Sequence, residues 1–176
     1  MVLMQLRDKY RIALLSAFAI GIHGIESLLP SPIPWMRLGL ANVITVIALL
    51  LYGFRTAMLV TLVRVIISSL ITGTFPGPAF ILSFGGGVLS TMSMGVVVLL
   101  APGLFSAVGL SIIGAFIHNM TQLILAYFLI IQRMEAVLFI APVITLAGTL
   151  TGALNGLVSE TVIRNLKKDI IEKKHK

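Results

Sequence analysis

The amino-acid sequence predicts an all-α fold, that of a polytopic membrane protein whose six transmembrane helices form one bundle. Of its 176 residues, 58% are hydrophobic and 11% are charged, whereas soluble domains are about 25% charged. The apolar residues form six long runs, and most of the charged residues gather at the two ends of the chain. A single integral membrane domain over residues 1–176 is therefore expected, which excludes soluble enzymes and disordered proteins.

The first three spans are separated by short breaks. Residues 12–29 form an apolar run that we interpret as a retained span rather than a cleaved signal peptide, because no loop follows a small-residue site. Residues 30–34 contain three prolines, which forbid helix. The second span, 38–52, is short, and a turn at 53–55 separates it from the third span, 56–72.

The last three spans are longer. Residues 79–100 form the fourth span, in which three consecutive glycines at 85–87 either lie within one helix or divide it into a re-entrant pair. Residues 104–131 form the fifth span and end at a polar segment, 132–135. Residues 136–163 form the sixth span. The two halves share no pattern of interruptions, so an inverted repeat is not expected.

The charge pattern predicts the topology. Basic residues at positions 7, 9 and 11 precede the first span, and six more lie in residues 164–176. An even number of spans places both termini on one side, and basic flanks indicate the cytoplasm. The net charge of +7 is explained in this way, and no nucleic-acid partner is expected.

Arg64 is the ionisable residue that lies deepest in an apolar span. It follows Arg55 by nine residues, which places it about 13 Å into the membrane. Thr61, Ser68 and Thr72 fall on the same helical stripe. Such a residue faces protein or water, so Arg64 is either a structural group tied to backbone carbonyls or to Glu26, or an anion clamp in a substrate cavity.

Other polar groups reach a similar depth from other spans. The candidate substrate-binding residues are Arg64, His118, Glu26, His23, Asn42, Asn119 and Gln122. They come from four spans, and all fall between the midplane and the outer third. The half nearer the cytoplasm offers only Asn155 and Glu160 in the sixth span. This distribution predicts a polar pocket that opens outward rather than a channel.

Small residues recur every four positions on two spans. Ala13, Ala17 and Gly21 form one such stripe, on the first span. The second stripe, on the sixth span, contains Gly148, Gly152 and Gly156. Small residues at this spacing let helix backbones approach closely. We expect the second stripe to pack within the molecule.

The loop over residues 30–40 contains Trp35 and Arg37. It is either a gating lid over the pocket or a plain connector in which Trp35 anchors the membrane interface.

Several motifs are missing. The chain has no phosphate-binding loop of the G-x-x-x-x-G-K-[ST] type, and no H-E-x-x-H or G-x-S-x-G motif. Its two aspartates, Asp8 and Asp169, both lie in the tails. No catalytic residue, metal site or cofactor is therefore expected.

Seven short segments carry a family resemblance: IESLLP at 25–30, LGLAN at 38–42, GF at 53–54, LVR at 62–64, GTF at 73–75, SFGGG at 83–87 and GAFIHN at 114–119. They resemble the bacterial Gx transporter family, which is also named heptaprenyl diphosphate synthase component I. The resemblance covers residues 12–163.

This family resembles the substrate-binding S components of energy-coupling factor transporters. The resemblance implies six helices and a site that opens outward under the first loop. It also implies a transmembrane coupling protein and cytoplasmic ATPases as partners. Ala13 and Ala17 match the A-x-x-x-A motif that meets the coupling protein, and Gly21 extends it. The expected function is capture of a small, anionic or amphipathic solute at a bacterial inner membrane, without enzymatic activity.

Two alternatives remain open. One is a membrane subunit of isoprenoid metabolism, in which His118 and Glu26 act as an acid–base pair if they meet. The other is a stand-alone secondary transporter in which Glu26 and His23 relay protons.

Overall fold

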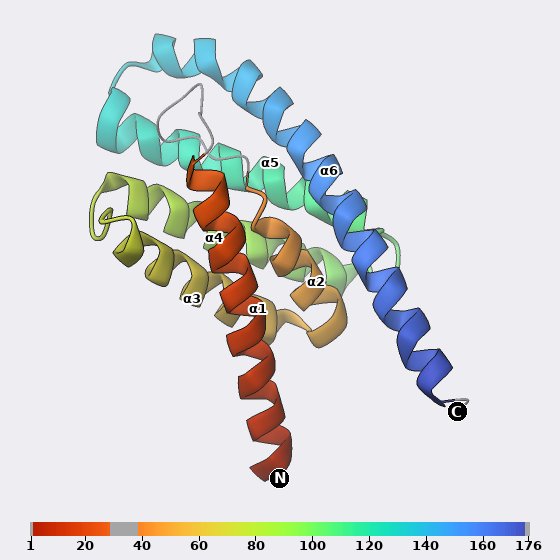
Figure 1. Cartoon of the computed structure of the whole chain (residues 1–176). Helices are drawn as coiled ribbons and strands as arrows, with labels where there is room; N and C mark the ends of the chain where they lie inside the picture. The colour runs from red at the N-terminus through yellow and green to blue at the C-terminus, as the bar shows by residue number, and fades with distance from the viewer. Residues whose placement is uncertain (1, 29–38, 175–176) are drawn as a thin grey trace.

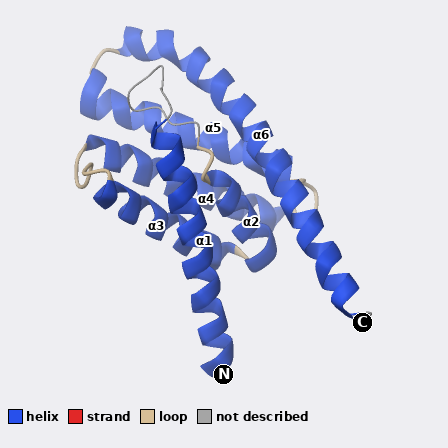
Figure 2. Cartoon of the chain, in the orientation of Figure 1, coloured by secondary structure: helices blue, strands red, loops and turns tan. Residues whose placement is uncertain are grey.

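The computed structural model describes residues 2–28 and 39–174, with side chains described for residues 8–26 and 39–168. Its helices are α1 (Val2–Leu28), α2 (Asn42–Tyr52), α3 (Phe54–Ile71), α4 (Pro78–Leu100), α5 (Ala107–Ala126) and α6 (Met134–Lys174). A π-helical segment, η1 (Tyr127–Ile131), continues α5. No strand occurs in the part of the chain that the structure describes (Figure 2). The prediction of an all-α bundle of six helices is confirmed.

Four helical segments of the described chain are long and apolar enough to cross a membrane: α3, α4, α5 together with η1, and α6. In contrast, α2 has only 11 residues and is therefore about 16 Å long, roughly half the thickness of a bilayer's hydrocarbon core. The second predicted span is thus a half-length helix, and its expected first residues, from Gly39 to Ala41, form a turn instead.

Both chain ends lie at the same end of the bundle (Figure 1), as expected for an even number of helices. The observed helices α1 and α6 extend beyond the predicted spans, since α1 begins at Val2 and α6 ends at Lys174. The prediction counted only apolar residues, whereas helical hydrogen bonding continues through the charged flanks.

Short connections define the helix ends. Gly53, with φ 86°, lies between α2 and α3 and donates its N–H to the Leu49 carbonyl. Pro78 occupies the first turn of α4, where a missing N–H is tolerated. Ser106 caps α5 by accepting a 3.3 Å hydrogen bond from the Gly109 N–H, and Gln132, with φ 51°, ends η1.

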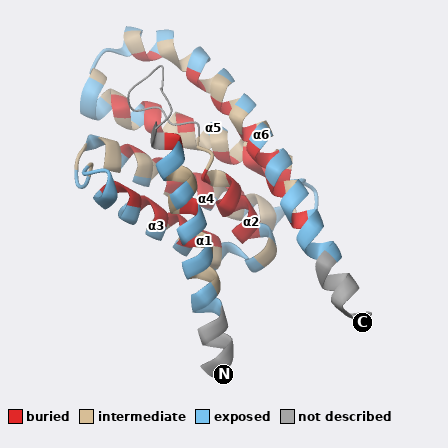
Figure 3. Cartoon of the chain, in the orientation of Figure 1, coloured by how far each residue is buried: buried red, intermediate tan, exposed pale blue. Residues whose placement is uncertain are grey.

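The buried apolar residues form two separate clusters. The larger one surrounds α2, whose residues from Val43 to Leu49 are all buried, and it includes Met94, Ala107 and Ile163. The smaller cluster contains Leu123, Val137 and Ile144 and joins α5 to α6. Buried positions concentrate on the inner helices α2 to α5, while α1 and α6 are mostly exposed or half-buried (Figure 3). A helix that is apolar on all sides is typical of a buried position, which explains the place of α2.

Glycines let the helices approach closely. The three glycines at residues 85–87 lie within one uninterrupted helix, α4, so a re-entrant break is not present. A Cβ atom at Gly152 would lie 3.1 Å from the Ile112 Cα atom on α5, and one at Gly156 would lie only 2.4 Å from the Val108 Cα atom. The small-residue stripe of α6 therefore packs against α5, as predicted.

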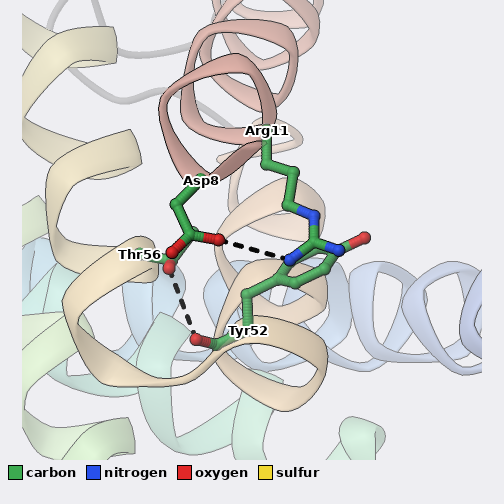
Figure 4. A network of polar contacts seen from close by, with 4 residues as sticks. All are labelled: Asp8, Arg11, Tyr52 and Thr56. Atoms are coloured by element: carbon green, nitrogen blue, oxygen red, sulfur yellow. Dashed lines mark hydrogen bonds and ion pairs between the residues drawn. The ribbon is translucent and has the colours of Figure 1, made fainter. Parts of the chain in front are cut away.

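A polar contact ties α1 to the turn between α2 and α3 (Figure 4). Arg11 donates a 3.3 Å hydrogen bond to Asp8, and its guanidinium lies 5.0 Å from the centre of the Tyr52 ring. Thr56 Oγ1 donates to the Tyr52 carbonyl oxygen at 3.3 Å. These contacts lie at the end of the bundle that holds the chain termini.

Candidate functional site

A cavity of about 50 Å³ lies within the bundle, which exceeds the roughly 10–15 Å³ that one water molecule needs. All seven residues predicted to bind substrate line it: His23, Glu26, Asn42, Arg64, His118, Asn119 and Gln122. They reach the cavity from α1, α2, α3 and α5. The structure therefore brings together every polar residue that the sequence analysis selected as a group.

The cavity lies between the two apolar clusters. Along α5, Ala107 belongs to the larger cluster, Ala115 to Gln122 border the cavity, and Leu123 belongs to the smaller cluster. Along α6 the order is reversed. Ile144 belongs to the smaller cluster, Thr151 and Asn155 border the cavity, and Ile163 belongs to the larger cluster. Polar groups are thus enclosed between two apolar layers of the bundle.

Arg64 is 6% exposed, and its Nε atom has no hydrogen-bond partner. Arg11 and Asp8 form an ion pair elsewhere in the described chain. Arg64 makes no hydrogen bond to a backbone carbonyl within that same part of the chain. Glu26 lines the same cavity as Arg64, so both interpretations of Arg64, as a structural group and as an anion clamp, stay predictions. A buried hydrogen-bond donor without an acceptor is costly, and an anion in the cavity would offset that cost at the Nε atom.

The backbone of Gly39 connects α1 with α6. Its N–H donates a 2.5 Å hydrogen bond to Oε1 of Glu26, and its carbonyl accepts a 3.0 Å hydrogen bond from Nδ2 of Asn155. Ser159 Oγ donates to the Val43 carbonyl one turn further along α2, at 3.3 Å. The sequence analysis placed Asn155 in the half nearer the cytoplasm, away from the pocket. This was wrong, because α2 is short and its first residues lie inside the bundle, within reach of α6.

On α5, three residues face the cavity in different ways. Gln122 is 6% exposed, and its side chain makes no hydrogen bond within the described part of the chain. Asn119 donates to the Ile144 carbonyl of α6 at 3.4 Å, so it also joins the two helices. A Cβ atom at Gly86 of α4 would lie 3.0 Å from the His118 ring and 3.1 Å from Gln122. A methyl group here would require both side chains to shift by a few tenths of an ångström.

The lining includes residues that the sequence analysis did not select as candidates. They are Gly39, Val65, Ser69, Thr72, Thr74, Ala79, Phe80, Ser83, Ala115, Thr151 and Asn155. Thr72 was the last member of the Arg64 stripe, which was a usable signal. Phe80 had none, because it is one apolar residue among many. Its ring is held between Phe75 and Phe84, with centroid distances of 4.8 and 5.5 Å.

A layer of hydroxyl groups lies one helical turn from Arg64, toward the chain termini. Thr61 Oγ1 is 3.3 Å from Thr45 Oγ1 and 3.0 Å from Thr91 Oγ1. Thr91 Oγ1 also donates to the Gly87 carbonyl at 2.9 Å. All three threonines are at most 1% exposed, so this layer joins α2, α3 and α4 in the interior of the bundle.

The predicted partner-contact residues Ala13, Ala17 and Gly21 are all exposed on α1. No atom lies within 4 Å of a Cβ atom built at Gly21. This stripe is therefore not used for packing by the described residues. The gating-loop residues Trp35 and Arg37 lie outside the described residues. Among described side chains, no group of three or more His, Cys, Asp or Glu is placed to hold a metal ion.

Together, these features define a helical membrane protein with a polar cavity within its bundle. A family model described as heptaprenyl diphosphate synthase component I matches residues 15–162. The chain belongs to that family, as its motifs predicted. Comparison with curated proteins and with solved structures gave no match.

Proposed function

We propose that this protein is the substrate-binding membrane subunit of an importer of the energy-coupling factor type, and that it captures a small, anionic or amphipathic solute. The convergence of seven polar residues on one cavity carries the proposal. Polar groups are costly inside a membrane bundle and usually serve a substrate or a relay there. The Nε atom of buried Arg64, which has no hydrogen-bond partner, favours an anionic group on the solute.

The exposed face of α1 supports the assignment to an importer that works with partner proteins. Ala13, Ala17 and Gly21 present a narrow surface of small side chains, flanked by Leu14 and Phe18, which are 60% and 57% exposed. Small residues at this spacing favour close packing with a second transmembrane helix. A transmembrane coupling protein would dock on this face, and cytoplasmic ATPases would supply the energy, since the sequence has no phosphate-binding loop of its own.

The proposed orientation follows the basic termini. With both termini in the cytoplasm of a bacterial cell, the turn between α3 and α4 and the start of α2 would face outward. In this orientation the solute would enter from outside, and the 30–40 segment would act as the gate.

Affinity purification from membranes tests the proposal. The tagged protein should carry a coupling protein and an ATPase pair, and native mass spectrometry should detect a bound small molecule. The double variant Ala13→Leu/Ala17→Leu should lose the partners but keep its thermal unfolding midpoint. The control Ala13→Ser/Ala17→Ser adds no bulk and should retain them. Partners that remain with the leucine variant, or the absence of both partners and ligand from the native protein, would refute the proposal.

The family description favours a second candidate, a membrane subunit of heptaprenyl diphosphate metabolism. His118 and Glu26 line the same cavity, which is the arrangement that an acid–base pair would need. Turnover of a prenyl diphosphate by the purified protein, abolished by His118→Ala, would favour this candidate over the transporter.

A further inference from the structure

We infer that residues 23–28, the C-terminal end of α1, form the movable wall of the cavity, and that α1 bends at Gly21 and Gly24 to admit a solute. This inference rests on the proposed function, because it describes how the same cavity would open to a solute that it must capture.

The first step concerns the size of the cavity. Its volume of about 50 Å³ accommodates about four water molecules, since each needs roughly 10–15 Å³. An amphipathic solute has a polar group and an apolar body, and it is larger than this. Capture of such a solute therefore requires one wall of the cavity to move.

The second step concerns the walls that are held in place. Asn155 of α6 donates a 3.0 Å hydrogen bond to the Gly39 carbonyl at the start of α2. The hydroxyl groups of Thr61 on α3 and Thr91 on α4 are 3.0 Å apart and buried. A Cβ atom at Gly152 of α6 would lie 3.1 Å from backbone atoms of α5, and α5 packs in turn against α4. Movement of any of these walls would break a buried polar contact or separate closely packed backbones.

The third step concerns the attachment of α1. This helix packs against α2 and α3, and the buried positions among its described side chains are Ser16, Ala19 and Glu26. None of them is a large apolar side chain, the kind whose burial contributes most to packing. The hydroxyl group of Ser16 has no hydrogen-bond partner. Among the walls of the cavity, α1 is therefore the one whose displacement loses least buried apolar surface.

The fourth step concerns the position of the bend. Ile22 packs against the larger apolar cluster, whereas the two residues of α1 that line the cavity, His23 and Glu26, follow it. Gly21 and Gly24 lie at this boundary, and glycine weakens the interior of a helix. No atom lies within 4 Å of a Cβ atom built at either position, so neither glycine is needed for packing within the described chain. They place a flexible point between the anchored part of α1 and the part that lines the cavity.

The hydrogen bond from the Gly39 N–H to Glu26 is one of the contacts that hold this wall closed. Bending of α1 would break it. The net contribution of a hydrogen bond is small when water or a solute can replace it, so this contact is compatible with a wall that opens and closes.

Thiol labelling of the purified protein in lipid nanodiscs tests the inference. The chain has no cysteine, and Ser69→Cys is a nearly isosteric change at a cavity-lining position that is 5% exposed. N-ethylmaleimide is too large to enter the closed cavity, so it reaches this thiol only when a wall opens. Measurable labelling of the folded protein is expected, and its absence would overturn the inference.

The double variant Gly21→Ala/Gly24→Ala should slow this labelling roughly fivefold or more, because alanine favours the straight helix at both positions. The added methyl groups meet open space, so the thermal unfolding midpoint should not fall. Glu135→Cys, at an exposed position near the start of α6, is the matched control, and its labelling rate should be the same with or without the two alanines. An unchanged rate at Ser69→Cys in the alanine variant would overturn the inference.

Distances between spin labels locate the movement. The pair Ile25→Cys/Leu70→Cys joins exposed positions on α1 and α3, and the control pair Leu70→Cys/Ile124→Cys joins exposed positions on α3 and α5. Double electron–electron resonance should give a broader distance distribution for the first pair than for the control pair, and the two alanines should narrow it. Equal widths for the two pairs would overturn the inference.

Neither measurement involves the partner proteins, so the two proposals fail in different ways. A rigid α1 in a protein that co-purifies with its partners would refute this inference alone. A movable α1 in a protein that carries neither partners nor ligand would refute only the importer proposal.

Discussion

The carbonyl oxygen of Gly39 accepts a 3.0 Å hydrogen bond from Nδ2 of Asn155, a residue 116 positions later in the chain. The same glycine donates its N–H to Glu26. The backbone of one residue thus joins α1, the start of α2 and α6 beside the cavity. The geometry depends on the backbone of Gly39, whose φ of 73° lies in the left-handed region.

Gly39→Ala should destabilise the protein by about 1–2 kcal/mol, because a Cβ atom disfavours a positive φ. Open space surrounds this position, so the loss would come from the backbone and not from a clash. The thermal unfolding midpoint in detergent measures the effect. Gly21→Ala is the control: it lies within α1 with equal space around it, and it should be neutral or stabilising by up to about 1 kcal/mol. An unchanged midpoint for Gly39→Ala would contradict the assigned role of this turn.

Gly148→Ala should destabilise the contact between α5 and α6 by about 1–3 kcal/mol through overpacking. A Cβ atom at Gly148 would overlap the side-chain amide of Asn119. Removing that amide in the double variant Gly148→Ala/Asn119→Ala should recover part of the loss. At Gly156 the new Cβ atom would meet the Val108 backbone at 2.4 Å, so no side-chain truncation on α5 should rescue Gly156→Ala. The unfolding midpoints of the native protein, Gly148→Ala, the double variant and Gly156→Ala provide the measurement. If the double variant recovers no stability, the proposed contact between Gly148 and Asn119 is wrong.

The features that could be predicted are those where a residue differs in polarity or helix propensity from the apolar run around it. Apolar runs separated by proline and glycine indicate the helices, because few other residues interrupt a membrane span. Arg64, His118 and Gln122 could be selected because a polar residue in an apolar run is rare and needs a partner. Phe80 could not be selected, since an apolar residue that lines a cavity resembles one that faces lipid.

Two other features depend on distances between helices, which a single sequence does not contain. The depth of Asn155 could not be predicted, because it depends on the shortness of α2 and on the path of α6 past its first turn. The role of the glycines at 85–87 could not be predicted either. A run of glycines is compatible with a helix break or with a helix that accommodates large side chains from its neighbours, and only the packing of α3 and α5 against α4 distinguishes the two.

Thr61→Val should cost about 1 kcal/mol of stability, and more than Thr45→Val. Thr61 is hydrogen-bonded to the hydroxyl groups of Thr45 and Thr91, whereas Thr45 is hydrogen-bonded to that of Thr61 alone. Valine has nearly the same shape as threonine, so the comparison isolates the hydroxyl. Unfolding midpoints of both variants provide the measurement, and a larger effect at Thr45 would show that Thr61 is not the centre of the layer.

Arg11→Ala should destabilise the protein by about 0.5–1 kcal/mol, through loss of its contact with the Tyr52 ring. Asp8→Asn should change stability by less, because the ion pair is solvent-exposed, with side-chain exposures of 38% and 63%. Repeating both measurements at high salt separates the contributions, since only the ion pair is strongly screened. Equal losses for the two variants at low salt would mean that the ring contact contributes nothing.

The length of α6 has a mechanical consequence. Its 41 residues span about 60 Å, twice the thickness of the hydrocarbon core, so a large part of the helix must project into water even when it is tilted. Arg164, Lys167 and Lys168 are exposed on this projection. The positive charge at this end is thus carried by a continuous helix and not by an irregular segment. A soluble protein that approaches this end meets an oriented electric field well before it reaches the bilayer, and its rate of encounter should fall as ionic strength rises.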